Sequence, residues 1–109
     1  MAIEITLENT DGRHGRYVAR IAGLDGEAEL VFTWRGDQLL SADHSFSPEG
    51  LRGSGAALAL LERLVADARA QGFRIIPLCP YVRAKYAEHP DWADVMTVAP
   101  GEKPRIAIH

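Results

Sequence analysis

The segment Leu51-Arg52-Gly53-Ser54-Gly55-Ala56-Ala57-Leu58 opens a stretch with helical periodicity, and we call residues 51–58 the glycine segment. We expect the helix to run from about Arg52 to Gln71. A glycine inside a helix costs about 1 kcal/mol relative to alanine, so two glycines at a helix start need a reason. One reason is close approach of an anionic ligand, because the first amides of a helix have no partner within it. The alternative is an ordinary glycine-rich loop before a helix.

After the glycine segment, apolar residues fall on one helical stripe, and Gly72 is suited to end the helix. Residues 73–78 form a short apolar run rich in β-branched residues, which predicts a strand. Because a helix separates this strand from the preceding one, we expect the two to pair in parallel. Pro80–Glu88 is expected to form a short second helix, and Arg105–Ile108 a final edge strand.

Before the glycine segment, apolar residues alternate with the period of β-strands over residues 3–8, 17–21, 28–34 and 38–46. Asp25-Gly26 predicts a type I′ hairpin turn. Four strands joined by short turns predict an antiparallel meander. The chain as a whole therefore predicts an α/β fold with a mixed sheet: the meander, a helix, a parallel splayed strand and a short helix. In the fourth strand, one face is expected to carry Leu40, Ala42, His44 and Phe46.

The composition limits the classes of function. The chain has 109 residues, of which 47% are hydrophobic, so we expect a single domain over residues 1–109. No apolar run reaches the length of a membrane span, and we recognise no signal peptide. The net charge of −3 argues against a broad nucleic-acid-binding surface. The single cysteine suits a reducing compartment, so we expect a cytoplasmic protein, and the histidines show no metal-ligand spacing, so we expect no metal site.

Two motifs carry a family resemblance. Arg52, Gly55 and Ala57 match the pattern Gln/Arg-x-x-Gly-x-Gly/Ala of the GNAT acetyltransferase superfamily, and the order of strands, motif, helix and strand resembles its core. The stretch Pro77-Leu78-Cys79-Pro80-Tyr81-Val82, followed by His89-Pro90, resembles a short GNAT-like subfamily with a Pro-x-Cys-x-aromatic-Val sequence. The resemblance covers most of the chain, from about residue 44 to residue 92.

The resemblance implies that the chain binds acetyl-coenzyme A as a co-substrate. In the superfamily the motif holds the pyrophosphate at the helix start, and the pantetheine arm enters a gap between the fourth and fifth strands. Pro77 favours such a gap, because it has no amide hydrogen to donate to a sheet. Lys85 and Arg83 are candidates for contacts with the 3′-phosphate or the adenine. The residues expected to bind the co-substrate are Phe46, Ser47, Arg52, Gly53, Ser54, Gly55, Ala56, Ala57, Leu58 and Cys79.

Three side chains are candidates for chemistry under this resemblance. Cys79 would accept the acetyl group if the start of the following helix favours its thiolate, and otherwise it is a small buried hydrophobic residue. His44 is the candidate general base, although Phe46 stands where some relatives carry a glutamate, and its alternative role is structural. Tyr86 corresponds to the tyrosine that protonates the departing thiolate in many superfamily members, or else it packs the short helix onto the sheet.

The function implied is transfer of an acetyl group from acetyl-coenzyme A to an unknown amine or protein acceptor. The net acidic surface is compatible with a cationic acceptor such as lysine or a polyamine. One alternative is a non-catalytic module that binds or senses acyl-coenzyme A, and another is a protein-interaction domain that retains only the fold. We expect a monomer or a weak dimer.

Overall fold

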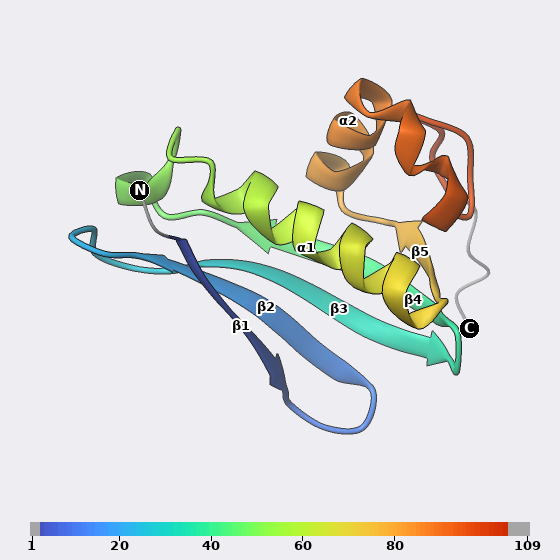
Figure 1. Ribbon diagram of the computed structural model, residues 1–109, viewed down its shortest axis with the longest axis horizontal. Helices are drawn as coiled ribbons and strands as arrows, with labels where there is room; N and C mark the ends of the chain where they lie inside the picture. Colours follow the sequence, from blue (N-terminus) through green and yellow to red (C-terminus); the bar gives the residue numbers. More distant parts are fainter. Residues whose placement is uncertain (1–2, 105–109) are drawn as a thin grey trace.

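The structure is a computed structural model that describes residues 3–104. Its elements are β1 (Ile3–Asn9), β2 (His14–Ile21), β3 (Ala28–Gly36), β4 (Leu39–Phe46), η1 (Glu49–Leu51), α1 (Ala56–Gln71), β5 (Arg74–Pro77), α2 (Pro80–Glu88) and η2 (Pro90–Val95). The five strands form one sheet in the order β1-β2-β3-β4-β5. Helix α1 lies across one face of this sheet, while α2 and η2 lie together near β5 (Figure 1). The predicted α/β fold with a mixed sheet is therefore confirmed.

The antiparallel meander of β1 to β4 is confirmed by the strand pairing. Ile3 pairs with Ile21 and Ile5 with Ala19, so these apolar residues share the sheet face that α1 covers. The connection between β2 and β3 differs from the prediction. It spans residues 22–27, and its positive φ values belong to Gly23 and Gly26. Asp25 has no positive φ, which a type I′ turn would require of it, so that turn assignment is wrong.

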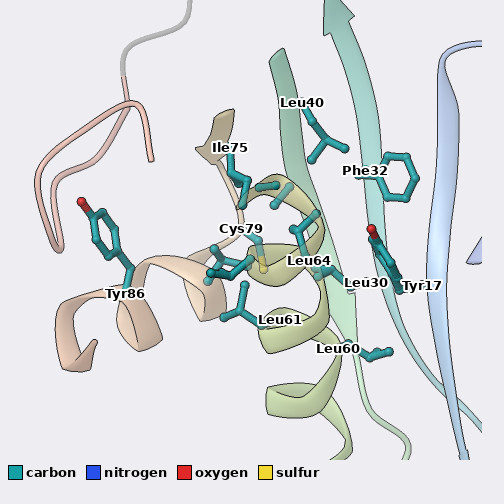
Figure 2. Close-up of a cluster of buried hydrophobic side chains, with 14 of the residues drawn as sticks. Tyr17, Leu30, Phe32, Leu40, Leu60, Leu61, Leu64, Ile75, Cys79 and Tyr86 are labelled. Atoms are coloured by element: carbon teal, nitrogen blue, oxygen red, sulfur yellow. The ribbon is translucent and has the colours of Figure 1, made fainter. Parts of the chain in front are cut away.

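Helix α1 buries its apolar stripe, which includes Leu60, Leu61 and Leu64, in the hydrophobic core shown in Figure 2. These three side chains are at most 1% exposed, and the burial of each contributes about 1.5–3 kcal/mol. A polar contact accompanies the packing, because the Tyr17 hydroxyl on β2 donates to the Asp67 carboxylate on α1 at 2.6 Å. The helix and the antiparallel strands thus form one core.

The start of α1 is at Ala56 rather than near Arg52. The two glycines therefore precede the helix, and both have left-handed backbone, with φ of 78° at Gly53 and 88° at Gly55. A Cβ added at either position would meet nothing within 4 Å. Because left-handed backbone favours glycine, the loop conformation by itself accounts for both residues. The expectation that they lie inside the first helical turn is wrong.

The end of α1 and the strand that follows agree with the prediction. Gly72 has φ of 77°, and its N–H donates to the Ala68 carbonyl at 2.9 Å, which closes the helix in a left-handed cap. β5 then runs parallel to β4, and the last pair of residues in this ladder is Ala42 with Pro77. The regular ladder ends at this pair, and one further hydrogen bond joins the two segments, from the Cys79 N–H to the Ala42 carbonyl oxygen at 2.9 Å.

A β-bulge interrupts the ladder between β3 and β4. Val31 pairs with His44, and the next residue, Phe32, pairs with Ala42. Asp43 is therefore an extra residue on β4 without a partner in this register. A bulge of this kind bends the strand and shifts the alternation of all side chains that follow it.

The bulge overturns the predicted face of the second half of β4. Leu40 faces the core as predicted, but Ser45 rather than His44 or Phe46 takes that face after the bulge. Ser45 contacts Cys79. His44 and Phe46 are exposed instead, and Phe46 is 50% exposed. The expectation that all the even-numbered residues of this strand share one face is wrong, because it assumed unbroken alternation.

The last part of the chain contains the predicted short helix. α2 spans Pro80–Glu88, and its proline lies in the first turn, where a missing N–H is tolerated. Pro90 begins the 3-10 segment η2. The edge strand expected at Arg105–Ile108 lies outside the described residues. Within residues 3–104, no helix combines the length and apolar character needed to cross a membrane.

Candidate active site

A surface cleft of about 380 Å³ lies between the glycine segment and α2. Most residues predicted to bind the co-substrate line it, namely Ser47, Arg52, Gly53, Gly55, Ala56, Ala57 and Leu58. Three predicted residues do not line it: Phe46, Ser54 and Cys79. The remaining wall residues are Leu51, Tyr81 and Lys85. Tertiary packing thus joins the start of α1 to one face of α2.

The start of α1 leaves backbone donors at the wall of the cleft. Its N-cap, Gly55, has no side chain that could accept from the first turn. The Ala56 N–H reaches Ser54 Oγ at 3.3 Å. The N–H groups of Ala57 and Leu58 belong to the same turn, where the helix itself offers no acceptor. Residues 56–59 contain no acidic side chain, so the positive end of the helix dipole is not neutralised from within this turn.

Two cationic side chains lie on opposite walls of the cleft. Arg52 is exposed, and its Nε donates to the Ser47 carbonyl oxygen at 3.5 Å. Lys85 Nζ lies 3.5 Å from a Glu88 carboxylate oxygen and 5.8 Å from the centre of the Tyr81 ring. Helix-start amides flanked by a guanidinium and an ammonium group favour an anion with several oxygens. The cleft therefore has the donors and the charge to bind a phosphate ester.

Tyr81 is the cleft residue that the sequence analysis missed. Its side chain is half-buried, and burial, followed by the Glu88 carboxylate, raises the pKa of its hydroxyl. Tyr81 and Lys85 are four residues apart and so share one face of α2. This spacing is the signal that could have paired the tyrosine with the lysine.

Cys79 lies where β5 passes into α2. Its backbone N–H donates to the Ala42 carbonyl at 2.9 Å, and the residue is the N-cap of α2. The residue is only 3% exposed and packs in the core beside α1, with Sγ 3.3 Å from Ser45 Oγ (Figure 2). This burial agrees with the interpretation of Cys79 as a small hydrophobic residue, and Ser45 gives its thiol one polar contact.

Arg83 stabilises the turn between β5 and α2. Its Nη1 donates to the carbonyl oxygens of Pro77 and Leu78, at 3.2 Å and 2.7 Å. Of the two basic residues suggested for the 3′-phosphate end, Lys85 lines the cleft, whereas Arg83 is engaged with the backbone. Arg83 therefore holds the position of Cys79 rather than a wall of the cleft.

His44 and Tyr86 lie apart from the cleft. His44 is exposed on the sheet face opposite α1, whereas Ser45 and Cys79 lie on the α1 face. Tyr86 is fully buried, and its hydroxyl donates to the Val98 carbonyl oxygen at 2.7 Å. Burial raises the pKa of Tyr86. The structure thus favours the interpretation that Tyr86 packs α2 into the core. His44, the candidate base, is separated from the Cys79 thiol by the thickness of the sheet.

Two comparisons with known proteins bear on this geometry. A search of curated proteins finds no match to the chain. The family model for the GCN5-related N-acetyl-transferases matches residues 16–95. The matched region begins in β2 and ends with η2, so it contains the glycine segment, the cleft and Cys79. The resemblance to the GNAT superfamily is confirmed by this match, and the chain belongs to the GCN5-related N-acetyltransferase family.

Proposed function

We propose that the protein binds acetyl-coenzyme A in the cleft and transfers the acetyl group to an amine. The observation that carries the proposal is the meeting of the α1 start, Arg52 and Lys85 in one cleft. Coenzyme A carries a pyrophosphate and a 3′-phosphate, and helix-start amides with flanking cations favour such groups. Membership of the family supplies the reaction class, which is N-acetyl transfer.

The end of β4 links the cleft to the end of the β4–β5 ladder. Ser47 lines the cleft, and Ser45 contacts Cys79. An extended chain advances about 3.3 Å per residue, so these two serines are about 7 Å apart along the chain. The parallel ladder ends at Ala42 and Pro77, just before this stretch. A pantetheine arm that follows the end of β4 out of the cleft would bring its thioester close to Cys79.

We infer direct transfer, with Cys79 beside the acetyl group rather than acetylated itself. The residue is 3% exposed and held by core packing, which disfavours its acting as a mobile acyl carrier. In direct transfer the acceptor nitrogen attacks the thioester carbonyl carbon. A C–N bond forms, the C–S bond breaks, and the coenzyme A thiolate takes up a proton that the nitrogen releases.

Binding is tested by thermal shift and calorimetric titration with acetyl-coenzyme A. A ligand at 100 times its Kd adds about 2.7 kcal/mol to the free energy of unfolding. Arg52→Ala and Lys85→Ala should each weaken binding by roughly tenfold, because each removes a charged phosphate donor. Arg13→Ala, the matched control, removes an exposed arginine from the β1–β2 turn and should change nothing. The assignment of the cleft as the acetyl-coenzyme A site would be contradicted if the ligand did not raise the melting temperature of the wild-type protein. It would also be contradicted if Arg13→Ala weakened binding as much as Arg52→Ala and Lys85→Ala do.

Transfer is tested by measuring coenzyme A release and acetylated product with a panel of amines, against hydrolysis without amine. Intact-mass analysis of the same reactions detects any acetyl adduct on the protein. Direct transfer predicts acetylated amine with no adduct, and transfer retained in Cys79→Ser. A single acetyl adduct that disappears in Cys79→Ser would support the cysteine route instead. Binding of acetyl-coenzyme A without transfer to any amine would support the non-catalytic alternative.

A further inference from the structure

The outer edge of β1 has no strand beside it among residues 3–104, because β1 is the first strand in the order of the sheet (Figure 1). The Thr10 N–H donates to the His14 carbonyl oxygen at 2.9 Å. Since hydrogen-bonded pairs alternate along an antiparallel ladder, the even-numbered residues of β1 bond to β2. The N–H and carbonyl groups of Ile3, Ile5 and Leu7 therefore point away from β2, where another extended chain can pair with them.

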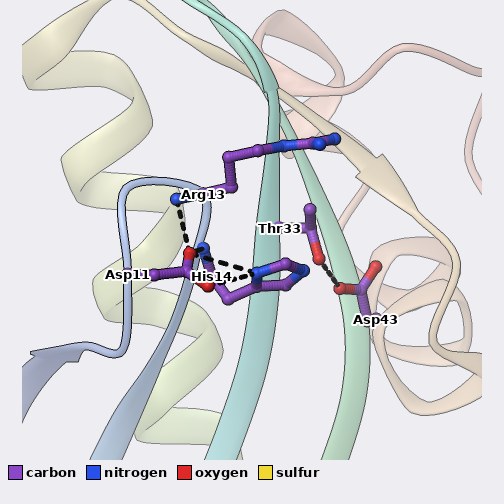
Figure 3. A network of polar contacts seen from close by, with 5 residues as sticks. All are labelled: Asp11, Arg13, His14, Thr33 and Asp43. Carbon is purple, nitrogen blue, oxygen red and sulfur yellow. Dashed lines mark hydrogen bonds and ion pairs between the residues drawn. The ribbon is translucent and has the colours of Figure 1, made fainter.

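The turn that joins β1 to β2 fixes this edge in place. The Asp11 carboxylate accepts hydrogen bonds from the N–H groups of Arg13 and His14 at 2.7 Å and 2.8 Å (Figure 3). These bonds close the turn directly after the β1–β2 ladder. An incoming chain therefore meets a preformed edge, and the ordering cost of binding falls mainly on that chain.

The two faces of the edge differ in character. Ile5 and Leu7 lie on the face that α1 covers, and Leu7 is 44% exposed. Glu4, Thr6 and Glu8 alternate with them on the opposite face. Thr6 Oγ1 is buried and has no hydrogen-bond partner among the residues that the structure describes. A chain that pairs with β1 would meet apolar side chains on one face and, on the other, two carboxylates that flank an unpartnered hydroxyl.

A surface cavity of about 670 Å³ lies at the start of this edge. Its lining combines apolar and acidic side chains, namely Ile3, Ile21, Leu24, Glu4, Asp25 and Glu27. The cation among its lining residues, Arg20, pairs with Glu27 at 2.6 Å. Three carboxylates and one guanidinium leave the lining with an excess of negative charge. Apolar walls beside carboxylates suit a lysine or arginine side chain, which has an apolar stem and a cationic head.

A second copy of the chain fits this edge poorly. If two β1 strands paired about Thr6, Glu4 of each copy would lie opposite Glu8 of the other. If they paired about Ile5, the Glu4 side chains of the two copies would be diagonal neighbours. Like charges across a strand pair are destabilising, and the net charge of −3 adds to the repulsion. Charge complementarity therefore favours a different chain, one that carries basic residues.

We propose that the β1 edge binds an extended basic segment of another protein as an additional antiparallel strand. The apolar residues of that segment extend the row of Ile5 and Leu7, and basic residues alternate with them on the other face. A basic side chain opposite Thr6 lies diagonally between Glu4 and Glu8, within reach of both. Rotation about χ1 turns the Thr6 hydroxyl toward the same cationic group. The basic residue opposite Glu4 reaches the cavity, which Glu4 lines.

The probe is a peptide of alternating lysine and valine, capped at both ends, and calorimetry measures its binding without acetyl-coenzyme A. Two control peptides separate charge from pattern: in one, glutamate replaces lysine, and in the other the same lysines and valines stand in two blocks. The alternating basic peptide alone should bind, and its affinity should fall as the salt concentration rises. Equal binding of the block peptide would overturn strand addition, and equal binding of the glutamate peptide would overturn the charge assignment.

Charge reversal on the protein tests the location of the site. Glu4→Lys and Asp25→Lys should each weaken binding about tenfold, because each turns an attraction for the basic segment into a repulsion. Asp37→Lys, the matched control, makes the same change of charge in the exposed β3–β4 turn and should bind as the wild type does. Thermal unfolding checks that each variant is folded. Equal weakening by the control would reduce the effect to net charge and refute the site.

The backbone contact is tested on the peptide, so that the protein fold is not disturbed. In an antiparallel pair the valine amides face Ile5 and Leu7, whereas the lysine amides point away from β1. N-methylation of the valine amides should therefore abolish binding, and N-methylation of the lysine amides should preserve most of it. Binding that survives valine methylation would overturn the pairing with β1.

Two further results would also decide against the proposal. A wild-type dimer, twice the 11.9 kDa of one chain, that Leu7→Lys dissociates would assign the edge to a second copy instead. Failure of the alternating basic peptide to bind the wild-type protein would refute the docking site. Neither result bears on the proposed acetyl transfer, because the cleft and the β1 edge are lined by different residues and are tested with different ligands.

Discussion

Replacement of Gly55 by alanine separates the conformational role of the glycine segment from its proposed role in binding. Gly55 has φ of 88°, and an added Cβ would meet nothing within 4 Å, so the change introduces backbone strain without a steric clash. A left-handed alanine costs about 1–2 kcal/mol. The lower entropy of the unfolded chain returns up to about 1 kcal/mol. We therefore expect Gly55→Ala to lower the free energy of unfolding by about 1 kcal/mol, which corresponds to a Tm lower by about 4–8 °C.

The matched control is Gly12→Ala in the β1–β2 turn. Gly12 has no positive φ, and a Cβ there also meets nothing within 4 Å, so its stability should not fall. Urea and thermal unfolding measure both variants. Because Gly55 lines the cleft, the added methyl group should also weaken binding of acetyl-coenzyme A, whereas Gly12→Ala should bind as the wild type does. Unchanged stability of Gly55→Ala would refute the left-handed conformation. Lower stability with unchanged affinity would refute the glycine segment as the pyrophosphate site.

Two further predictions concern polar contacts outside the cleft. Tyr17→Phe should lower the free energy of unfolding by about 1.5–3 kcal/mol, because it removes a hydrogen bond to the Asp67 carboxylate. Burial, reinforced by Asp67, raises the pKa of Tyr17, so unfolded tyrosine ionises first and wild-type stability should decline as the pH rises above about 10. Urea unfolding across this pH range should show a weaker decline in the variant, and identical curves would contradict the assignment. Hydrogen bonds from the Arg13 and then the His14 N–H groups lower the pKa of Asp11 to about 2. His14→Ala should leave most of that shift in an NMR titration, and a return to the ordinary pKa would assign the shift to the imidazole instead.

Residues that constrain their own backbone made the second half of the fold predictable. Gly72 ends α1 in a left-handed cap, and Pro77 is the last residue of β5. Pro80 opens α2 at the position where a proline is tolerated. Each effect acts within one turn of chain, so the amino-acid sequence alone carries it. The start of α1 was misplaced because Gly53 and Gly55 were taken as helical residues, although their left-handed backbone excludes them from the helix.

The bulge at Asp43 could not be predicted in the same way. Its existence depends on which residues of β3 pair with β4, namely Val31 with His44 and Phe32 with Ala42. Alternation within one strand carries no information about that register. For this reason the sequence analysis placed His44 on the same face as Leu40, and it did not single out Asp43, whose carboxylate accepts hydrogen bonds from Thr33 and Ser41.

The sequence by itself determined the order of strands and helices, the parallel strand after α1 and the motif that signals the family, because these follow from local periodicity and residue spacing. The tertiary structure decided which side chains meet. It brought Tyr81 and Lys85 of α2 to the glycine segment, buried Cys79 against Ser45, and turned Asp43 to the opposite face of the sheet. These outcomes required the tertiary structure because they depend on the packing and pairing of residues far apart in the chain.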